Sequence, residues 1–150
     1  MNMKLGVKLS MLVLAIAAAN LLTAGETRSY IDPRSATDKN ALPFSGAVLA
    51  GDTLYISGSL GLKDGKVPDD PTEEARLVMD SIKRSVEAAG MTMDDLVSVQ
   101  IFCSDVAHYQ KFNDVYKTYF TKEYPARAFI GAGTLLFNAR FEVVATAVRR

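Results

Sequence analysis

The sequence predicts an α+β domain in which two helices cover one face of a sheet. Short runs rich in β-branched and aromatic residues alternate in polarity, as half-buried strands do. Two longer segments repeat apolar residues every three or four positions, as helices with one buried face do. The segments follow one another as strand, strand, helix, strand, helix, strand, strand. The chain has 150 residues and no internal repeat, so one domain accounts for it.

The first 25 residues have the pattern of a secretory signal peptide. Residues 1–8 contain two lysines and no acid, residues 9–19 form an apolar stretch, and small residues end the segment. We expect cleavage after Ala24 or Gly25 and a periplasmic or secreted mature protein. An uncleaved membrane anchor is the alternative, but the apolar stretch is shorter than the ~20 residues that span a bilayer.

The mature chain is slightly acidic. Removing residues 1–25 takes away two lysines and no acid, which leaves 15 basic and 17 acidic residues. This balance shows no basic patch of the kind that binds nucleic acid. The single cysteine, Cys103, cannot form an internal disulfide and lies in an apolar run, so we expect a buried thiol. His108 is the only histidine and has no cluster of ligands near it in the sequence, so no metal is expected.

A polar arm and a hairpin open the mature chain. Residues 26–42 are mixed in character and have no clear period, so we interpret them as an N-terminal arm before a domain at residues 43–150. The runs at 47–50 and 53–58 flank Gly51-Asp52, and glycine at the first turn position suits a type II′ turn. A second turn is expected within residues 60–66.

The first helix is predicted from Pro71 to Ala89. Asp70 can cap it, proline fits its first turn, and Gly90 ends it. The apolar positions that form its buried face are Ala75, Val78, Met79, Ile82, Val86 and Ala89. The charged residues expected on its solvent face are Glu73, Glu74 and Arg76.

The second half of the domain contains three more strands and a helix. Residues 96–102 are a strand, and a helix that begins at Ser104-Asp105 follows it. The aromatic residues expected in the buried stripe of this helix are Tyr109, Phe112, Tyr116 and Tyr119. The last two strands are predicted at 126–132 and 140–148.

Both faces of the last strand are largely apolar. Glu142 shares one face with Val144, Thr146 and Val148, while the other face carries Phe141, Val143 and two alanines. The helices cover only one face of the sheet, so we expect another subunit to cover the face that carries Glu142. A monomer measured by light scattering would contradict this.

Arg127 and Glu142 are single opposite charges in two strand-like segments that are neighbours in the sequence. Charges in such apolar surroundings are costly unless they are paired or touch a polar ligand. A guanidinium grips a carboxylate in a bidentate way, and a glutamate can orient or activate water. The pair therefore indicates a site for a small acid in which the two groups meet, with a structural ion pair as the alternative.

A signature-like segment runs from Pro125-Ala126-Arg127 through Leu135 to Phe141-Glu142-Val143. The segments that accompany it are Pro43-Phe44-Ser45, Tyr55-Ile56-Ser57-Gly58, Val86-Glu87-Ala88-Ala89-Gly90, Phe112-Asn113-Asp114-Val115-Tyr116 and Ala145-Thr146-Ala147-Val148. Together these residues resemble the RidA/YjgF family of reactive-intermediate deaminases, from about Pro43 to the end of the chain.

The resemblance implies a chorismate-mutase-like α+β fold, a homotrimer with clefts between its subunits, and no metal or organic cofactor. It also implies hydrolysis of reactive 2-enamines and 2-imines, such as 2-aminoacrylate, to 2-keto acids and ammonia. No nucleic-acid partner, and no membrane after signal cleavage, is expected.

Site residues follow from the same resemblance. Arg127 would bind the substrate carboxylate, and Glu142 would hold or activate water. Ser57 and Gly58 would line the pocket, and Asn113 falls on a position linked with the cleft. From the residues alone, Ser57 suits a turn equally well, and a lone Asn on a helix is more often simply hydrogen-bonded.

Three positions depart from the family pattern. Phe44 replaces a tyrosine that is common in active members, Phe129 replaces a cysteine two residues after the arginine, and Leu136 replaces a proline. Phe129 is bulky, shares a strand face with Arg127 and is expected to narrow the pocket. These departures favour the alternative function, a non-catalytic small-acid-binding or chaperone-like trimer. A ribonuclease role is weaker, because the chain has no histidine-based acid/base pair.

Overall fold

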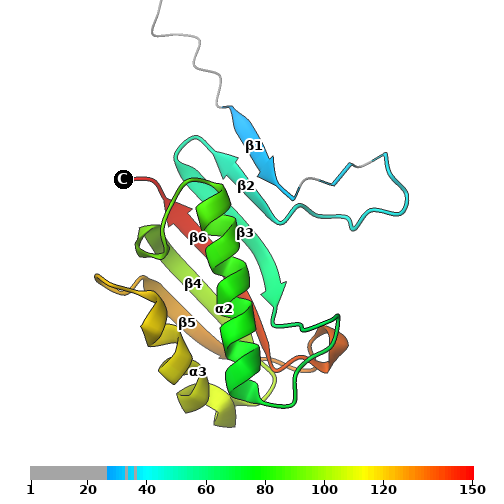
Figure 1. The fold of residues 1–150 in the computed structure, drawn as a ribbon, viewed down its shortest axis with the longest axis vertical. Coiled ribbons are helices and arrows are strands. Elements are labelled where there is room, and N and C mark those ends of the chain that lie inside the picture. Colours follow the sequence, from blue (N-terminus) through cyan, green and yellow to red (C-terminus); the bar gives the residue numbers. More distant parts are fainter. Residues whose placement is uncertain (1–26, 33, 36) are drawn as a thin grey trace, which may run out of the picture.

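The structure is a computed structural model that describes residues 27–150, except residues 33 and 36 (Figure 1). The predicted signal peptide, residues 1–25, lies outside the described residues. Across the part of the chain that is described, no helix has the length and apolar character needed to cross a membrane.

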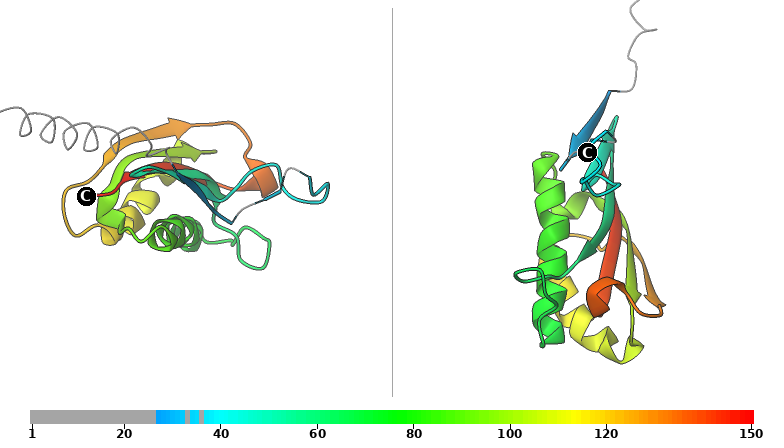
Figure 2. Two further views of the ribbon diagram at one scale, coloured as in Figure 1. Left: turned by 90° about the horizontal axis from the view of Figure 1, so that it is seen from above. Right: turned by 90° about the vertical axis from the view of Figure 1, so that its right-hand side faces the viewer.

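The domain is one mixed six-stranded sheet with two helices. The strand order is β1-β2-β3-β6-β4-β5, and every pair is antiparallel except β4–β5, which is parallel. The strands are β1 (Arg28–Ile31), β2 (Ala47–Ala50), β3 (Thr53–Leu60), β4 (Leu96–Cys103), β5 (Ala126–Gly131) and β6 (Phe141–Val148). The helices α2 (Pro71–Ala88) and α3 (Tyr109–Tyr116) lie on the same face of the sheet (Figure 2). The α+β prediction is confirmed.

The N-terminal arm is more ordered than its sequence indicates. Residues 28–31 form β1 and pair antiparallel with β2. β1 pairs with β2 through backbone groups, which does not require alternating apolar side chains. The sequence of this segment therefore does not show the period of a strand. The β2–β3 hairpin turns at Gly51, whose φ of 57° lies at the first turn position, as a type II′ turn requires.

Helix α2 begins as predicted and buries the predicted face. The side chain of Asp70 accepts a hydrogen bond from Thr72 N at 2.9 Å, and proline occupies the first turn. Ala75, Val78, Met79, Ile82 and Val86 are all fully buried. One expectation is wrong: Glu74 is also fully buried instead of facing solvent, because Arg140 and backbone groups of β6 surround its carboxylate.

The sheet has one core face and one open face. The core side chains of β6 are Phe141, Val143, Ala145 and Ala147, which pack under the helices. Tyr55, Phe102, Glu142, Val144 and Thr146 point to the opposite side, here called the open face. No described helix lies over the open face (Figure 2). Glu142 therefore lies on the face that was expected to meet another subunit.

Candidate functional site

Arg127 is held against α3 by two hydrogen bonds, to Asn113 and to the Tyr109 hydroxyl, and by two aromatic rings. Its Nη1 donates to Asn113 Oδ1 at 2.8 Å, and its guanidinium carbon lies 4.7 Å from the centre of the Tyr116 ring. The guanidinium carbon also lies 5.8 Å from the centre of the Tyr109 ring. These contacts orient the guanidinium by cation–π attraction and hydrogen bonding and still leave several of its N–H donors free. No described carboxylate is within ion-pair distance of Arg127.

The sequence of α3 explains this arrangement. Tyr109, Asn113 and Tyr116 recur at intervals of four and three, so they share the helix face that lies beside β5. The predicted aromatic stripe needs correction, since Tyr109 is 45% exposed, whereas Phe112 and Tyr116 are buried. Tyr119 lies beyond α3, where its hydroxyl donates to Asp80 Oδ1 at 2.7 Å.

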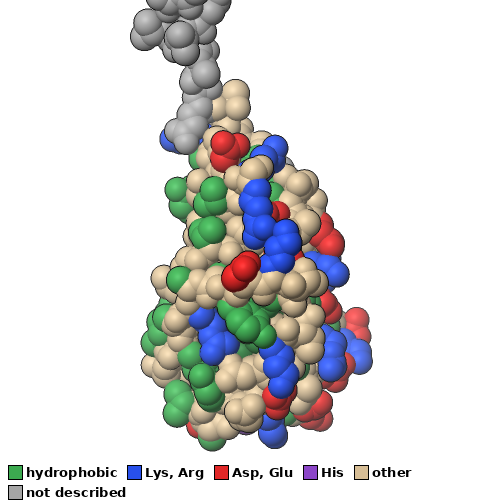
Figure 3. Space-filling view, turned by 90° about the vertical axis from the view of Figure 1, so that its left-hand side faces the viewer, with side chains coloured by type: hydrophobic (Ala, Val, Ile, Leu, Met, Phe, Trp, Pro, Cys, Tyr) green, Lys and Arg blue, Asp and Glu red, His purple; other side chains and the backbone are tan. Residues whose placement is uncertain are grey.

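A cavity of about 350 Å³ opens between α3 and the start of β5. Its lining includes Asn113, Tyr116, Lys117, Tyr124 and Arg127. Figure 3 looks at the side on which α3 and β5 lie in Figure 1, and there hydrophobic side chains lie beside Lys and Arg side chains. Asp114 also lines the space, and its carboxylate pairs with Lys117. The lining cation without a carboxylate partner among the described residues is Arg127, and together with the apolar and aromatic walls it suits a small organic acid.

Tyr116 contributes a neutral hydroxyl to this region. The hydroxyl is buried and has no hydrogen-bond partner among the described residues. Burial raises the pKa of Tyr116 to about 12, while the Arg127 charge opposes that rise. The phenol therefore stays protonated throughout the physiological range.

Phe129 packs into the core and not into this cavity. Its ring meets Tyr109 edge-on at a centroid distance of 4.9 Å and Phe112 at 5.7 Å. It shares the strand face of Arg127, as predicted, and packs against Tyr109, one of the two rings beside the guanidinium. It is not among the residues that line the cavity.

Glu142 and Gly58 form a second group on the open face. Glu142 is near the start of β6, and Gly58 lies in β3 at an irregularity between Ile56 and Ser59. A Cβ atom at residue 58 would clash with Glu142 Oε1 and lie 3.2 Å from Glu142 Cδ. The glycine therefore leaves the space that the carboxylate occupies.

Ser57 directly precedes Gly58 in β3, and its side chain contacts the segment that contains Phe44. Ser57 Oγ donates to Ser45 O at 2.7 Å, and Ser57 N donates to Gly46 O at 3.0 Å. The hydroxyl thus fixes the segment before β2. Ser57 lies inside β3 and not in a turn, so the alternative turn role is wrong. Phe44 adjoins Ser45 and is 51% exposed.

Within one chain, Arg127 and Glu142 do not meet, so the expectation that they share a groove of neighbouring strands is wrong. β4 lies between β5 and β6. Arg127 pairs with Val99, a core residue, whereas Glu142 pairs with Phe102 on the open face. Paired residues point to the same side of a sheet, so the two charges project from opposite faces. The structural ion pair between them is excluded within a chain for the same reason.

Sequence reasoning missed two parts of the site region. Tyr109 was assigned to the core but is exposed, whereas Tyr116 is buried as expected; that both contact Arg127 was missed, although their spacing around Asn113 already placed all three on one helix face. The ion pair of Glu74 with Arg140, 2.8 Å long, was missed because nothing in the local sequence distinguishes Glu74 from a solvent-facing helix residue. Over the described part of the chain, no three His, Cys, Asp or Glu residues cluster in a way that could hold a metal ion.

Comparison with known proteins adds an independent line of evidence. The family described as endoribonuclease L-PSP matches residues 36–149. A relative from Capra hircus named 2-iminobutanoate/2-iminopropanoate deaminase is 36% identical over 110 residues, which cover 71% of this chain and 80% of the relative. A relative of the same name from Dermatophagoides farinae is 36% identical over 104 residues, covering 67% and 81%.

Solved structures agree with these matches. The YjgF gene product of E. coli superposes with a TM-score of 0.72 at 29% identity, over 81% of this chain and 100% of that one. E. coli TdcF with bound serine gives 0.73 at 27% identity, over 81% and 100%. From the family match over most of its length and from relatives above 30% identity, this chain belongs to the RidA/YjgF family, which the matching description calls endoribonuclease L-PSP.

Proposed function

We propose that this protein hydrolyses reactive 2-enamines and 2-imines to 2-keto acids and ammonia. Arg127 binds the substrate carboxylate, and Glu142 positions the water that attacks the imine carbon. The curated relatives named 2-iminobutanoate/2-iminopropanoate deaminase, at 36% identity, support this reaction.

The observation that carries the proposal is the state of Arg127. Its guanidinium is oriented by Asn113 and two tyrosine rings, has no carboxylate partner among the described residues, and faces a cavity of about 350 Å³. An oriented guanidinium with free donors is suited to a bidentate grip on a carboxylate. A purely structural arginine would be expected to have its charge paired.

The two groups of site residues come together in a trimer. One subunit supplies Arg127 and Asn113 from the edge strand β5 and helix α3, and a neighbour supplies Gly58 and Glu142 from its open face. Two findings support this arrangement: β5 is an edge of the sheet, and the open face carries no described helix. Association thus covers the apolar open face and completes the site in one step.

The chemistry needs little beyond positioning. The C=N carbon of the substrate is already electrophilic, so one oriented water can add to it. Glu142 accepts a proton from that water as its oxygen bonds to carbon. Returning that proton to the imine nitrogen gives a tetrahedral carbinolamine. The carbinolamine hydroxyl then loses its proton to Glu142, which passes it to the nitrogen as the C–N bond breaks and the C=O bond forms, so one imine and one water give one keto acid and one ammonia.

A coupled assay tests this function. An amino-acid oxidase generates 2-iminopropanoate, and pyruvate formation is followed with the wild type, Arg127→Ala and the control Arg76→Ala, which removes an exposed arginine of α2. We expect acceleration by the wild type and the control and none by Arg127→Ala. An inactive wild type would contradict the proposal.

Binding without turnover is the second candidate. It is favoured by Phe44, which has no hydroxyl to offer, and by Ser57, whose hydroxyl is already bonded to Ser45 O. In that case 2-oxobutanoate would raise the melting temperature of the wild type but not of Arg127→Ala, while the imine would decay at its uncatalysed rate.

We also propose that the protein acts in the periplasm or outside the cell, because residues 1–25 have the pattern of a secretory signal peptide. Expressing the full chain in a bacterium and measuring the mass of the exported product tests this. A product that begins near residue 25 or 26 supports export, and a full-length product that stays in the cytoplasm contradicts it.

A further inference from the structure

We propose that Glu74 is a positioning residue for Glu142 and acts through the backbone at the start of β6. The inference rests on the proposed function, in which Glu142 positions the attacking water. It adds to that function a residue of α2 that touches neither the substrate nor the water.

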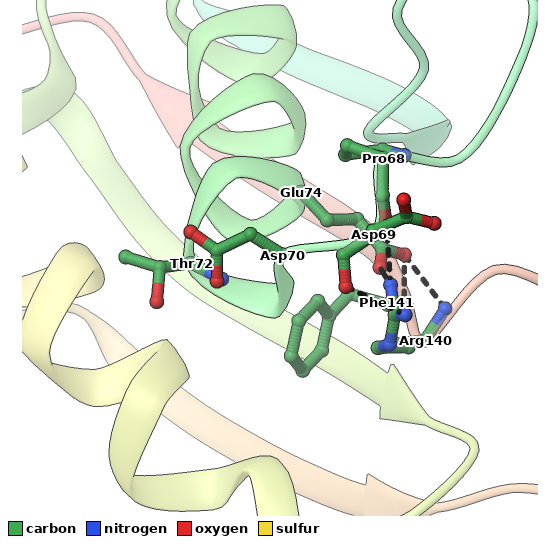
Figure 4. Close-up of polar contacts among 7 residues, drawn as sticks. All are labelled: Pro68, Asp69, Asp70, Thr72, Glu74, Arg140 and Phe141. Carbon is green, nitrogen blue, oxygen red and sulfur yellow. Dashed lines mark hydrogen bonds and ion pairs between the residues drawn. The ribbon is translucent and has the colours of Figure 1, made fainter.

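The Glu74 carboxylate binds the two residues that immediately precede Glu142 (Figure 4). Oε1 accepts hydrogen bonds from Arg140 N at 2.6 Å and Phe141 N at 3.1 Å, and Oε2 lies 2.8 Å from Arg140 Nη1. Glu74 is fully buried, so water does not compete for these bonds. A carboxylate that accepts backbone N–H bonds in a buried site forms short, strong hydrogen bonds.

These bonds replace a missing part of the sheet. β3 pairs with β6 only as far as Leu60, which lies opposite Glu142. The residues before Glu142 therefore have no partner on β3, and buried backbone N–H groups need an acceptor. Glu74 supplies it from the helix. The carboxylate thus fixes the backbone from which Glu142 projects.

The same helical turn also holds the end of β3. A Cβ atom at Gly61 would clash with Glu74 O and lie 3.0 Å from Glu74 Cγ. Helix α2 therefore packs closely on the strand that carries Gly58 and binds the strand that carries Glu142. Through these two contacts the first turn of α2 sets how Gly58 and Glu142 lie relative to each other.

The side chain of Arg140 also connects the start of β6 to the loop before α2. Its guanidinium donates to Pro68 O at 2.9 Å and Asp69 O at 3.0 Å, in the loop before α2. A buried carboxylate is tolerated when it is paired and fully hydrogen-bonded. The neighbouring Glu73 offers a contrast, because its carboxylate pairs with Lys63 in an exposed ion pair.

Loss of this support affects turnover and not carboxylate binding. A displacement of about 1 Å in a catalytic group can cost about a hundredfold in rate. Arg127 projects from the opposite face of the sheet, with β4 between its strand and β6, so its grip on the carboxylate is independent of Glu74.

Two variants of the full chain test the proposal. Glu74→Gln keeps an oxygen that accepts from the backbone but loses the charge opposite Arg140, and Glu74→Ala loses both. Turnover of 2-iminopropanoate is divided by the number of competent sites, counted by calorimetric titration with 2-oxobutanoate. This division removes the effect of any unfolded fraction. Two control variants are used: Glu73→Gln changes the neighbouring residue of α2, and Tyr119→Phe removes hydrogen bonds to Arg76 O and Asp80 of the same helix.

We expect kcat per competent site to fall roughly threefold to tenfold in Glu74→Gln and about a hundredfold in Glu74→Ala, with KM unchanged. Both controls keep the wild-type value. If the wild type hydrolyses the imine and Glu74→Gln matches it per site, the positioning role is wrong and the proposed function stands. If the wild type does not hydrolyse the imine, the proposed function and the positioning role of Glu74 are both wrong.

Discussion

Arg127 and Asn113 are joined by a hydrogen bond of 2.8 Å between an edge strand and a helix. The amide oxygen accepts from Nη1 and so fixes the plane of the guanidinium above the Tyr116 ring. The residue proposed to bind the substrate carboxylate, Arg127, and the residue that orients it, Asn113, can thus be changed separately by mutation.

Asn113→Ala is expected to weaken binding of 2-oxobutanoate by about 1–2 kcal/mol, because a hydrogen bond to a charged group contributes roughly that much. The guanidinium keeps its charge but loses its fixed plane. Isothermal titration calorimetry measures the change, and Lys83→Ala, on an exposed part of α2, is the control. Equal affinity in Asn113→Ala and the wild type would show that the amide does not orient Arg127.

Gly58→Ala is expected to remove at least about nine-tenths of imine hydrolysis, since the new methyl group takes the space of the Glu142 carboxylate. Gly133→Ala is a matched control, because a Cβ at residue 133 has nothing within 4 Å. Initial rates with 2-iminopropanoate measure the effect. Full activity in Gly58→Ala would mean that the position of Glu142 next to Gly58 is irrelevant to the reaction.

Glu74→Ala is expected to lower the free energy of unfolding by about 3–5 kcal/mol, because it leaves Arg140 without its buried partner. Glu73→Ala removes a surface partner of Lys63 and is expected to leave stability nearly unchanged. Urea denaturation of both variants measures the difference. Similar midpoints for the two variants would contradict the distinction between the buried pair and the surface pair.

Tyr116→Phe is expected to leave stability at pH 7 unchanged or slightly raised, since it removes a buried hydroxyl that has no partner. Tyr119→Phe loses bonds to Asp80 and to Arg76 O and is expected to cost about 1 kcal/mol. Urea denaturation compares the two, and the reverse order would contradict the assignment.

The raised pKa of Tyr116 also predicts a pH dependence. In the unfolded chain a tyrosine ionises near pH 10, whereas the folded-state pKa is about 12. The stabilisation is therefore complete below pH 10 and is lost as the pH rises from about 10 to about 12. Tyr116→Phe should lack this part of the alkaline loss of stability, measured as melting temperature against pH.

Local sequence patterns were enough to predict the helices and strands but not the order of the strands in the sheet. The buried face of α2 and the two faces of β6 follow from periods of 3.6 and 2, which a short window of sequence contains. The insertion of β6 between β3 and β4 depends on pairing between distant segments, which no local window contains. For that reason Arg127 and Glu142 were expected on adjoining strands.

The candidate site was predicted in part. The resemblance named Asn113 and Gly58 as residues of the cleft, and the structure places Asn113 beside Arg127 and Gly58 beside Glu142. Glu74 could not be found in this way, because a glutamate in the first turn of a helix is ordinarily a solvated residue that favours the helix dipole. Only the tertiary position of Arg140 makes it a core residue.

Because Arg127 and Glu142 project from opposite faces of the sheet, the proposed shared site predicts complementation between two inactive variants. If neighbouring subunits share each site, Arg127→Ala and Glu142→Gln are inactive alone, yet a co-refolded mixture contains some interfaces that combine the intact arginine of one chain with the intact glutamate of the next. For equal amounts and random association, about a quarter of the interfaces regain both groups. Dilution that dissociates the assembly would abolish this complementation.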